Sequence, residues 1–218
     1  MDRARIYRGV CRRMPSAWKL IRLALWGRIN FNDLSEWENC YEAPPPEKLE
    51  KLTNRIPNIV LAALKLTEPH NKILEVSAGF GNYIGKVSSS KVRHATEFSP
   101  AAVNHLQSIG IKTHKAVLPK LPYEDGSFDL VTTFSVFEHL PKKAIVRESF
   151  EECHRVTREA MIFSVPFDCM QPWNTLIHNF DFTKELILEY TDGLFSMDSW
   201  EVVKDGSTTR SISYLKKL

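Results

Sequence analysis

The sequence predicts an α/β fold with a mostly parallel sheet that ends in an antiparallel hairpin. After Pro69, short apolar runs alternate with helical segments at a spacing typical of a parallel sheet covered by helices on both faces. Near the end, Asp205-Gly206-Ser207 lies between two strand-like runs, which indicates a hairpin turn. The part before Pro69 is helical or polar, so we expect it to form an N-terminal helical extension.

Seven segments have the apolar, bounded composition of strands, and four others have helical patterns. The expected strands are 73–76, 92–96, 111–114, 128–133, 160–165, 195–204 and 208–215. The expected helices of the sheet region are 82–87, 100–108, 142–156 and 184–190, and Thr183 is placed to cap the last one. We therefore predict two parts, a helical extension or lid at residues 1–68 and the sheet domain at residues 69–218.

Composition excludes several classes of protein. The chain has 218 residues, of which 43% are hydrophobic and 25% charged, as in ordinary globular proteins. It contains no uncharged apolar stretch of about 18 residues, so no membrane-spanning helix is predicted. The four cysteines are scattered without a C-x-x-C pair, which favours reduced thiols in a cytoplasmic protein. No metal site is predicted.

Charge is distributed unevenly along the chain. Residues 1–28 carry eight basic side chains against Asp2 alone, a net charge of +7, and the remaining residues sum to −4. The mildly acidic body argues against nucleic acid as a partner of the predicted sheet domain. The basic arm, which contains Trp18 and Trp26, has two interpretations. It is either a helix packed on the domain or a peripheral contact with an anionic membrane surface.

The first candidate site follows the first predicted strand. Gly79 and Gly81 lie in a strand-to-helix turn, where they let the backbone approach a ligand closely or simply pack the helix on the strand. Glu97 ends the next strand, 22 residues after Glu75. A carboxylate at that place accepts hydrogen bonds from ribose hydroxyls in nucleotide-binding α/β folds, and a solvated carboxylate is the alternative.

Two further motifs separate the cofactor types. Residues 121–131 read Leu-Pro-Tyr-Glu-Asp-Gly-Ser-Phe-Asp-Leu-Val, and residues 138–141 read Glu-His-Leu-Pro. With the glycine turn, this succession over residues 72–166 resembles the class I S-adenosylmethionine-dependent methyltransferases, especially the small-molecule group called methyltransferase type eleven. The resemblance implies a Rossmann-like methyltransferase fold and S-adenosyl-L-methionine as cofactor.

The resemblance also implies roles by position. Gly79 and Gly81 would pass under the methionine part of the cofactor, Glu75 would orient its amino group, and Glu97 would hold its ribose. Other residues fall where the family contacts the adenine, the methionine carboxylate or the reactive methyl group. They are Ser77, Phe98, Val117, Leu118, Phe134, Ser135 and Tyr41.

Two residues depart from the family pattern. Ser77 stands where the family usually has its first glycine, and it fits without cost only if its φ is not positive. Otherwise it would store strain of about 1–3 kcal/mol. Val117 stands where an aspartate commonly meets the adenine amino group, and its loss removes a hydrogen bond worth roughly 0.5–1.5 kcal/mol.

Methyl transfer needs an aligned acceptor atom, exclusion of water and, for a hydroxyl acceptor, a base. His139 is the candidate base, although it can also cap or pack its own loop, and Glu138 is the alternative base or an orienting partner. His178 is a third candidate, in an aromatic insert after the fifth strand. In that insert Phe167, Trp173 and His178 either line the acceptor or cover the core.

The sequence thus predicts a methyltransferase that acts on an O or N atom of a small metabolite or a glycan. The alternatives are an RNA or protein methyltransferase, and a non-catalytic cofactor-binding or scaffold protein that keeps the fold. Nucleic-acid bases are disfavoured as acceptors, because no Asn-Pro-Pro-aromatic sequence follows the fourth strand and no Pro-Cys nucleophile follows the strands.

Overall fold

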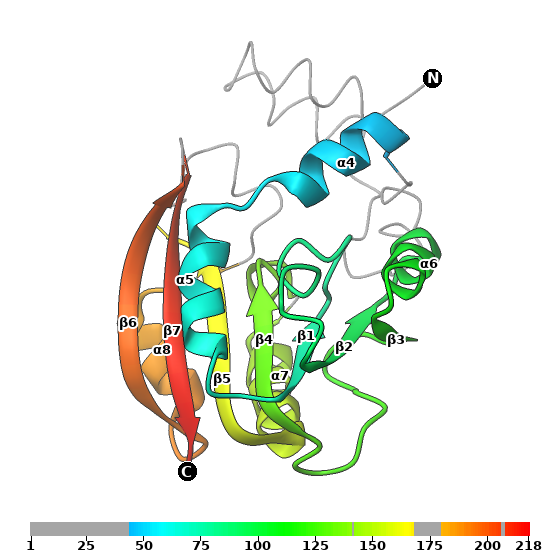
Figure 1. Cartoon of the computed structure of the whole chain (residues 1–218). Coiled ribbons are helices and arrows are strands. Elements are labelled where there is room, and N and C mark those ends of the chain that lie inside the picture. Colours follow the sequence, from blue (N-terminus) through cyan, green and yellow to red (C-terminus); the bar gives the residue numbers. More distant parts are fainter. Residues whose placement is uncertain (1–43, 141, 168–179, 206–207) are drawn as a thin grey trace, which may run out of the picture.

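The computed structural model describes residues 44–140, 142–167, 180–205 and 208–218, and these form a seven-stranded sheet with helices on both faces (Figure 1). The strand order is β3-β2-β1-β4-β5-β7-β6. The first five strands pair in parallel, and β7 is antiparallel to both β5 and β6. The strands are β1 (Lys72–Val76), β2 (Val92–Glu97), β3 (Lys112–Lys115), β4 (Phe128–Phe134), β5 (Thr157–Pro166), β6 (Phe195–Asp205) and β7 (Thr208–Lys217). The predicted fold class is confirmed, including its C-terminal hairpin.

The helices begin and end at recognisable signals. Pro57 separates the first two, and the hydroxyls of Ser99 and Thr183 accept hydrogen bonds from Ala102 N–H and Leu186 N–H as N-caps. The predicted cap at Thr183 is therefore confirmed. The described helices are α4 (Pro46–Asn54), α5 (Asn58–Thr67), α6 (Pro100–Ser108), the 3-10 helix η1 (Phe137–His139), α7 (Lys143–Val156) and α8 (Lys184–Thr191).

The helix predicted at 82–87 is wrong, because the structure has a series of turns there. Gly85 N–H bonds to Gly81 O at 2.9 Å, but Lys86 N–H bonds to Tyr83 O in a tighter turn. A Cβ on Gly85 would lie 2.6 Å from Gly81 O, so this packing admits only glycine. Two glycines within five residues also weaken the preference for a regular helix.

Two apolar clusters fill the space between the sheet and its helices. Behind the sheet in Figure 1, α7 and α8 cover a cluster that includes Val131, Phe150 and Phe163. In front, α5 contributes Ile59 and Ala63 to the second cluster. Burial of each large aliphatic side chain stabilises the fold by about 1.5–3 kcal/mol. Helix α5 thus packs on the sheet, although the sequence assigned it to the extension.

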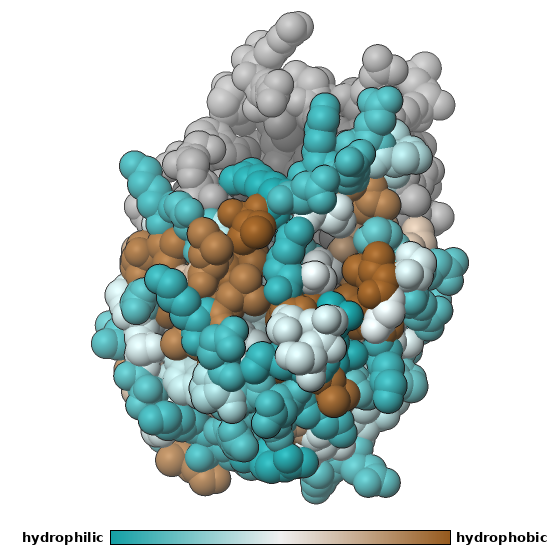
Figure 2. All heavy atoms as spheres, viewed as in Figure 1, coloured by the Kyte–Doolittle hydropathy of each residue, from teal (hydrophilic) through white to brown (hydrophobic). Residues whose placement is uncertain are grey.

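Large apolar side chains also remain exposed, among them Ile56, Leu61 and Val202. Figure 2 shows apolar surface over α5 and the neighbouring strands of the hairpin. In the described part of the chain, no helix has the length and apolar character needed to cross a bilayer. The basic arm at 1–28 and the predicted site residues Tyr41, Trp173 and His178 lie outside the described residues.

Candidate cofactor and acceptor site

The candidate site lies at one edge of the sheet. Because β1, β2, β4 and β5 are parallel, their carboxyl ends meet there, at the upper side in Figure 1. Helix α4 lies beyond that edge in the same view. Open α/β sheets bind ligands in the crevice outside these strand ends. The predicted residues that the structure describes lie at these strand ends or in the loops that follow them.

The glycine turn after β1 is held in the left-handed region. Ser77, Gly79 and Gly81 have φ values of 55°, 56° and 78°. A Cβ at Gly81 would lie 2.7 Å from the Leu106 side chain of α6, so glycine also allows this close packing. Ser77 therefore has the positive φ that is unfavourable for a residue with a side chain, and its backbone stores strain.

Glu97 is the point where the glycine turn and β2 meet. Its carboxylate is 2% exposed. Oε2 accepts a hydrogen bond from Gly79 N–H at 2.7 Å, and Oε1 accepts from the N–H groups of Phe98 and Ser99 at 2.8 and 3.1 Å. Because a carboxylate oxygen accepts two hydrogen bonds, Oε2 retains one acceptor position for a ribose hydroxyl. A second hydroxyl at Oε2 requires Gly79 N–H to move away.

Glu75 is a buried carboxyl at the end of β1. Its Oε2 accepts a hydrogen bond from Ile84 N–H at 2.9 Å. Burial raises the pKa of Glu75 to about 8, and the negative charge of Glu97 acts in the same direction. The carboxyl is thus mostly protonated at neutral pH, and a cation placed beside it would favour its ionised form. This chemistry fits the ammonium and sulfonium groups of S-adenosylmethionine.

The residues predicted to surround the adenine differ in exposure. The end of β3 lies beside Glu97, since Ala116 N–H donates to Glu97 O at 3.2 Å. Val117 follows at once and is half-buried, as is Phe98. Leu118 is buried in the cluster that faces α7. The structure thus brings Phe98 and Val117 to the edge beside Glu97.

The predicted methyl end of the site follows β4. Phe134 packs on Tyr83 with ring centroids 4.9 Å apart. Ser135 has a φ of 56°, donates its N–H to Ser164 O at 2.9 Å and accepts a hydrogen bond at Oγ from Arg210. Two interactions therefore hold Ser135 in a conformation that serine rarely adopts.

Glu138 is buried in the short helix η1, where it is 1% exposed. Neither of its carboxyl oxygens has a hydrogen-bond partner in the described structure. His139 Nε2 lies 3.8 Å from Glu138 Oε1. Burial raises the pKa of Glu138 to about 7, against smaller opposite effects of its own backbone N–H, of Arg210 and of the Ser135 hydroxyl. A carboxyl with that pKa can exchange a proton near neutral pH.

Arg210 was missed by reasoning from sequence. It pairs in register with Pro166 at the end of β5, which brings the start of β7 to the same edge as Ser135. The only signal in the sequence was the hairpin turn. Counting back along its two strands places residue 210 at this edge, but the pairing of β7 with β5 had to be known first.

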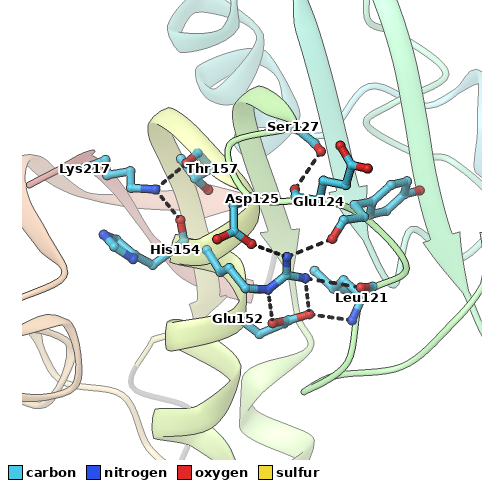
Figure 3. Close-up of polar contacts among 10 residues, drawn as sticks. Leu121, Glu124, Asp125, Ser127, Glu152, His154, Thr157 and Lys217 are labelled. Carbon is cyan, nitrogen blue, oxygen red and sulfur yellow. Dashed lines mark hydrogen bonds and ion pairs between the residues drawn. The ribbon is translucent and has the colours of Figure 1, made fainter.

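The most specific family motif lies at the other end of β4, and Figure 3 shows its contacts. Arg155 of α7 donates to Leu121 O, Tyr123 O and Asp125 Oδ1 at 3.3, 2.8 and 2.7 Å. It also forms two hydrogen bonds of 2.8 Å with Glu152, whose Oε1 accepts from Leu121 N–H at 2.7 Å. This motif therefore ties the loop before β4 to α7.

The end of the motif ties two strands together. Asp129 Oδ2 accepts hydrogen bonds from the N–H groups of Asn71 and Lys72 at 3.2 and 2.9 Å. Its Oδ1 forms an ion pair with Arg158. Asp129 thus fixes the start of β1 against β4 and β5, and it does not contact the candidate site residues.

Comparison with known proteins supports this description. Residues 74–164 match the family model of a methyltransferase domain. No curated protein matches the chain. A structure of 1,6-didemethyltoxoflavin-N1-methyltransferase from Burkholderia thailandensis is similar with a TM-score of 0.65 and 13% identity, over 84% of this chain and 86% of that one.

Two further solved structures have the same fold. Magnesium protoporphyrin IX methyltransferase from Synechocystis PCC 6803, with bound SAH, has a TM-score of 0.63 and 12% identity, over 86% of this chain and 96% of that one. A SAM dependent methyltransferase from Aquifex aeolicus has a TM-score of 0.56 and 20% identity, over 85% and 99%. At these low sequence identities, the structural similarity shows that the fold is shared.

The chain thus combines a matched methyltransferase domain with the seven-stranded fold that was predicted from the resemblance to class I S-adenosylmethionine-dependent methyltransferases. Residues 74–164 of this chain are a methyltransferase domain, and the predicted family, enzyme class and cofactor agree with this match and with the fold of the compared structures.

Proposed function

We propose that the protein transfers the methyl group of S-adenosylmethionine to an oxygen or nitrogen atom of a small molecule. The observation that carries the proposal is the hydrogen bond of Gly79 N–H to Glu97 Oε2, which joins the glycine turn to the strand-end acid. A small-molecule acceptor is also supported by the names of two similar proteins, a 1,6-didemethyltoxoflavin methyltransferase and a magnesium protoporphyrin IX methyltransferase.

The cofactor side of the proposal assigns one task to each acid. Glu97 accepts a hydrogen bond from the ribose, and Glu75 ionises when the amino group of the cofactor comes near it. The left-handed turn at Ser77, Gly79 and Gly81 lets the backbone lie close under the methionine part. When bound, S-adenosylmethionine supplies an electrophilic methyl group. Tyr41, outside the described residues, stays a prediction as a contact of the methionine carboxylate.

The acceptor side needs a group that takes a proton. We assign this task to Glu138, because it is buried, lacks a hydrogen-bond partner among the described residues and has a pKa near neutrality. His139, at 3.8 Å, is the neighbour that can pass the proton to solvent. Phe134 and Ser135 precede it at the end of β4, where Ser135 Oγ accepts a hydrogen bond from Arg210.

Calorimetry of the full chain with S-adenosylhomocysteine tests cofactor binding, and we expect a single saturable site. Methyl transfer is tested with a radiolabelled methyl donor and three pools, namely small metabolites, RNA and denatured protein. Label in the small-molecule pool is the expected result. Label only in RNA or protein would contradict the proposal. Cofactor binding without transfer to any pool would favour the non-catalytic alternative.

A further inference from the structure

Arg210 lies at the acceptor end of the site and has no task in the cofactor geometry. Its pairing with Pro166, and the hydrogen bond of Phe167 N–H to Thr209 O at 2.9 Å, fix the start of β7 beside the end of β5. The Arg210 side chain is half-buried. Its one hydrogen bond within the described structure goes to the neutral hydroxyl of Ser135.

A guanidinium offers five N–H donors in a planar fork that matches a carboxylate or a phosphate. Elsewhere in the described chain this fork is used for that purpose: Arg155 pairs with Glu152 and Asp125, and Arg158 pairs with Asp129. Arg210 has no carboxylate oxygen of a described residue within the 4.0 Å of an ion pair. Most of its donors therefore remain available to a ligand.

Glu138 is the second polar group at this end of the site. Arg210 contacts Ser135, which precedes Glu138 by three residues, and the charge of Arg210 acts on the Glu138 carboxyl. Both oxygens of Glu138 are buried without a hydrogen-bond partner in the described structure. A buried carboxyl without a hydrogen-bond partner and a half-buried guanidinium without a close ion pair are both costly in the ligand-free protein. A ligand that carries both an anionic group and an O–H or N–H donor would satisfy the two groups at once.

We propose that Arg210 and Glu138 form the acceptor subsite, and that the methyl acceptor is a small acid. Its carboxylate or phosphate binds the guanidinium, and its reactive O–H or N–H faces Glu138. This inference rests on the proposed function. In the transfer, the acceptor lone pair forms the new bond to the methyl carbon as the carbon–sulfur bond breaks. Its proton passes to Glu138, and the bond electrons stay on sulfur as a neutral thioether.

Arginine side-chain NMR of the full chain, saturated with S-adenosylhomocysteine, tests the subsite without a known substrate. The Nε–H signal of Arg210 is assigned by its loss in Arg210→Lys, or in Arg210→Gln if the first variant does not fold. The probes are acetate, inorganic phosphate and neutral acetamide. Arg93 is the matched control, because it is half-buried and also donates to a neutral oxygen, Val87 O, away from this edge.

We expect a saturable shift of the Arg210 signal with acetate or phosphate, at an affinity at least tenfold above that of Arg93. A response to acetate identifies a carboxylate, and a response to phosphate alone identifies a phosphate ester. Equal responses of the two arginines, no response, or an equal response to acetamide would overturn the inference. Calorimetry on the same sample separates the two failures, since loss of S-adenosylhomocysteine binding would instead count against the proposed function.

Discussion

The two ends of β4 are built in opposite ways. At the entry, the loop that leads into β4, Arg155 pairs with Glu152 and with Asp125, and Arg155 and Glu152 also bond to the loop backbone. At the exit, the end of β4 and the loop that follows it, Ser135 is held at positive φ and Glu138 is buried without a hydrogen-bond partner in the described structure. Natural proteins satisfy buried polar groups where stability is at stake and leave them strained or unpaired at functional sites.

The residues that identify the family in the sequence are also different from those to which we assign methyl transfer. The motif at 121–131 is the most family-specific part of the sequence, yet its contacts fix the loop before β4, α7 and the start of β1. The groups to which we assign methyl transfer lie at the exit, where the sequence signal is short. A family can therefore be recognised from residues that build the fold, while the acceptor subsite that we propose includes a residue outside any motif, Arg210.

The largest effect is expected at the entry. Arg155→Met removes five charge-assisted hydrogen bonds and leaves Glu152 and two carbonyls without this donor. We expect the free energy of unfolding to fall by about 3 kcal/mol, and the melting temperature by roughly 6–12 °C. Chemical denaturation measures it. Affinity for S-adenosylhomocysteine should change less than twofold in the folded variant, and a tenfold loss would mean that the entry is part of the site.

Arg158→Met is the matched control for this change. Arg158 is more exposed than Arg155, with 56% of its side chain accessible against 32%, and it pairs with Asp129 alone among carboxylates. Exposed ion pairs contribute about 0–1 kcal/mol, so we expect a much smaller loss of stability. Equal losses in the two variants would remove the special role of the Arg155 network.

The buried carboxyl of Glu138 should make the free energy of unfolding depend on pH. The pKa of Glu138 is raised to about 7 in the folded protein, so the folded state binds more protons than the unfolded state between pH 4.5 and 7. The free energy of unfolding therefore falls as pH rises through this window, and Glu138→Gln removes that fall. We expect the variant to gain up to about 3 kcal/mol over the wild type between pH 4.5 and 7.5.

For Glu152→Gln we expect the opposite dependence of stability on pH. Its hydrogen bonds with Arg155 hold the pKa of Glu152 below the usual value. That carboxylate stabilises the fold at neutral pH, and its contribution is lost as pH falls. Urea unfolding of both variants across the pH range is the measurement. A pH-independent difference between Glu138→Gln and the wild type would show that Glu138 is an ordinary, ionised carboxylate.

Local patterns were enough to predict most of the fold. Apolar runs located the five parallel strands, and Asp205-Gly206 located the hairpin, because each depends on neighbours in sequence. The helix expected at 82–87 was wrong because the close contact of Gly85 with Gly81 depends on tertiary packing. The position of Arg210 could not be predicted, since it follows from the pairing of strands distant in sequence.

The candidate site was predicted in part. Glu75, Glu97 and the glycine turn do meet at one edge of the sheet, as strand ends in a parallel sheet must. The burial of Glu138 could not be read from its place after β4, because a short 3-10 helix turns the side chain inward. The roles of Tyr41 and His178 stay predictions.

Glu97→Ala tests the assignment of the ribose contact to the carboxylate at the end of β2. The variant loses the acceptor for ribose and leaves three backbone N–H groups without this partner. We expect affinity for S-adenosylhomocysteine to fall at least tenfold, because charge-assisted hydrogen bonds contribute about 1.5–3 kcal/mol each. Calorimetry well below the melting temperature measures it. Glu124→Ala, an exposed acid of the entry loop, is the control, and equal affinities in the two variants would exclude the ribose assignment.

The smallest effect concerns Ser77, the strained residue of the glycine turn. Its φ of 55° carries strain of about 1–3 kcal/mol, and glycine would relieve it at the cost of about 0.4–1 kcal/mol of extra unfolded-state entropy. Ser77→Gly should therefore raise the free energy of unfolding by about 1 kcal/mol and the melting temperature by roughly 2–4 °C. Ser77→Ala keeps the strain and should give no gain. If alanine and glycine stabilise equally, the hydroxyl and not the backbone is the unfavourable element, and the strain assigned to this turn is absent.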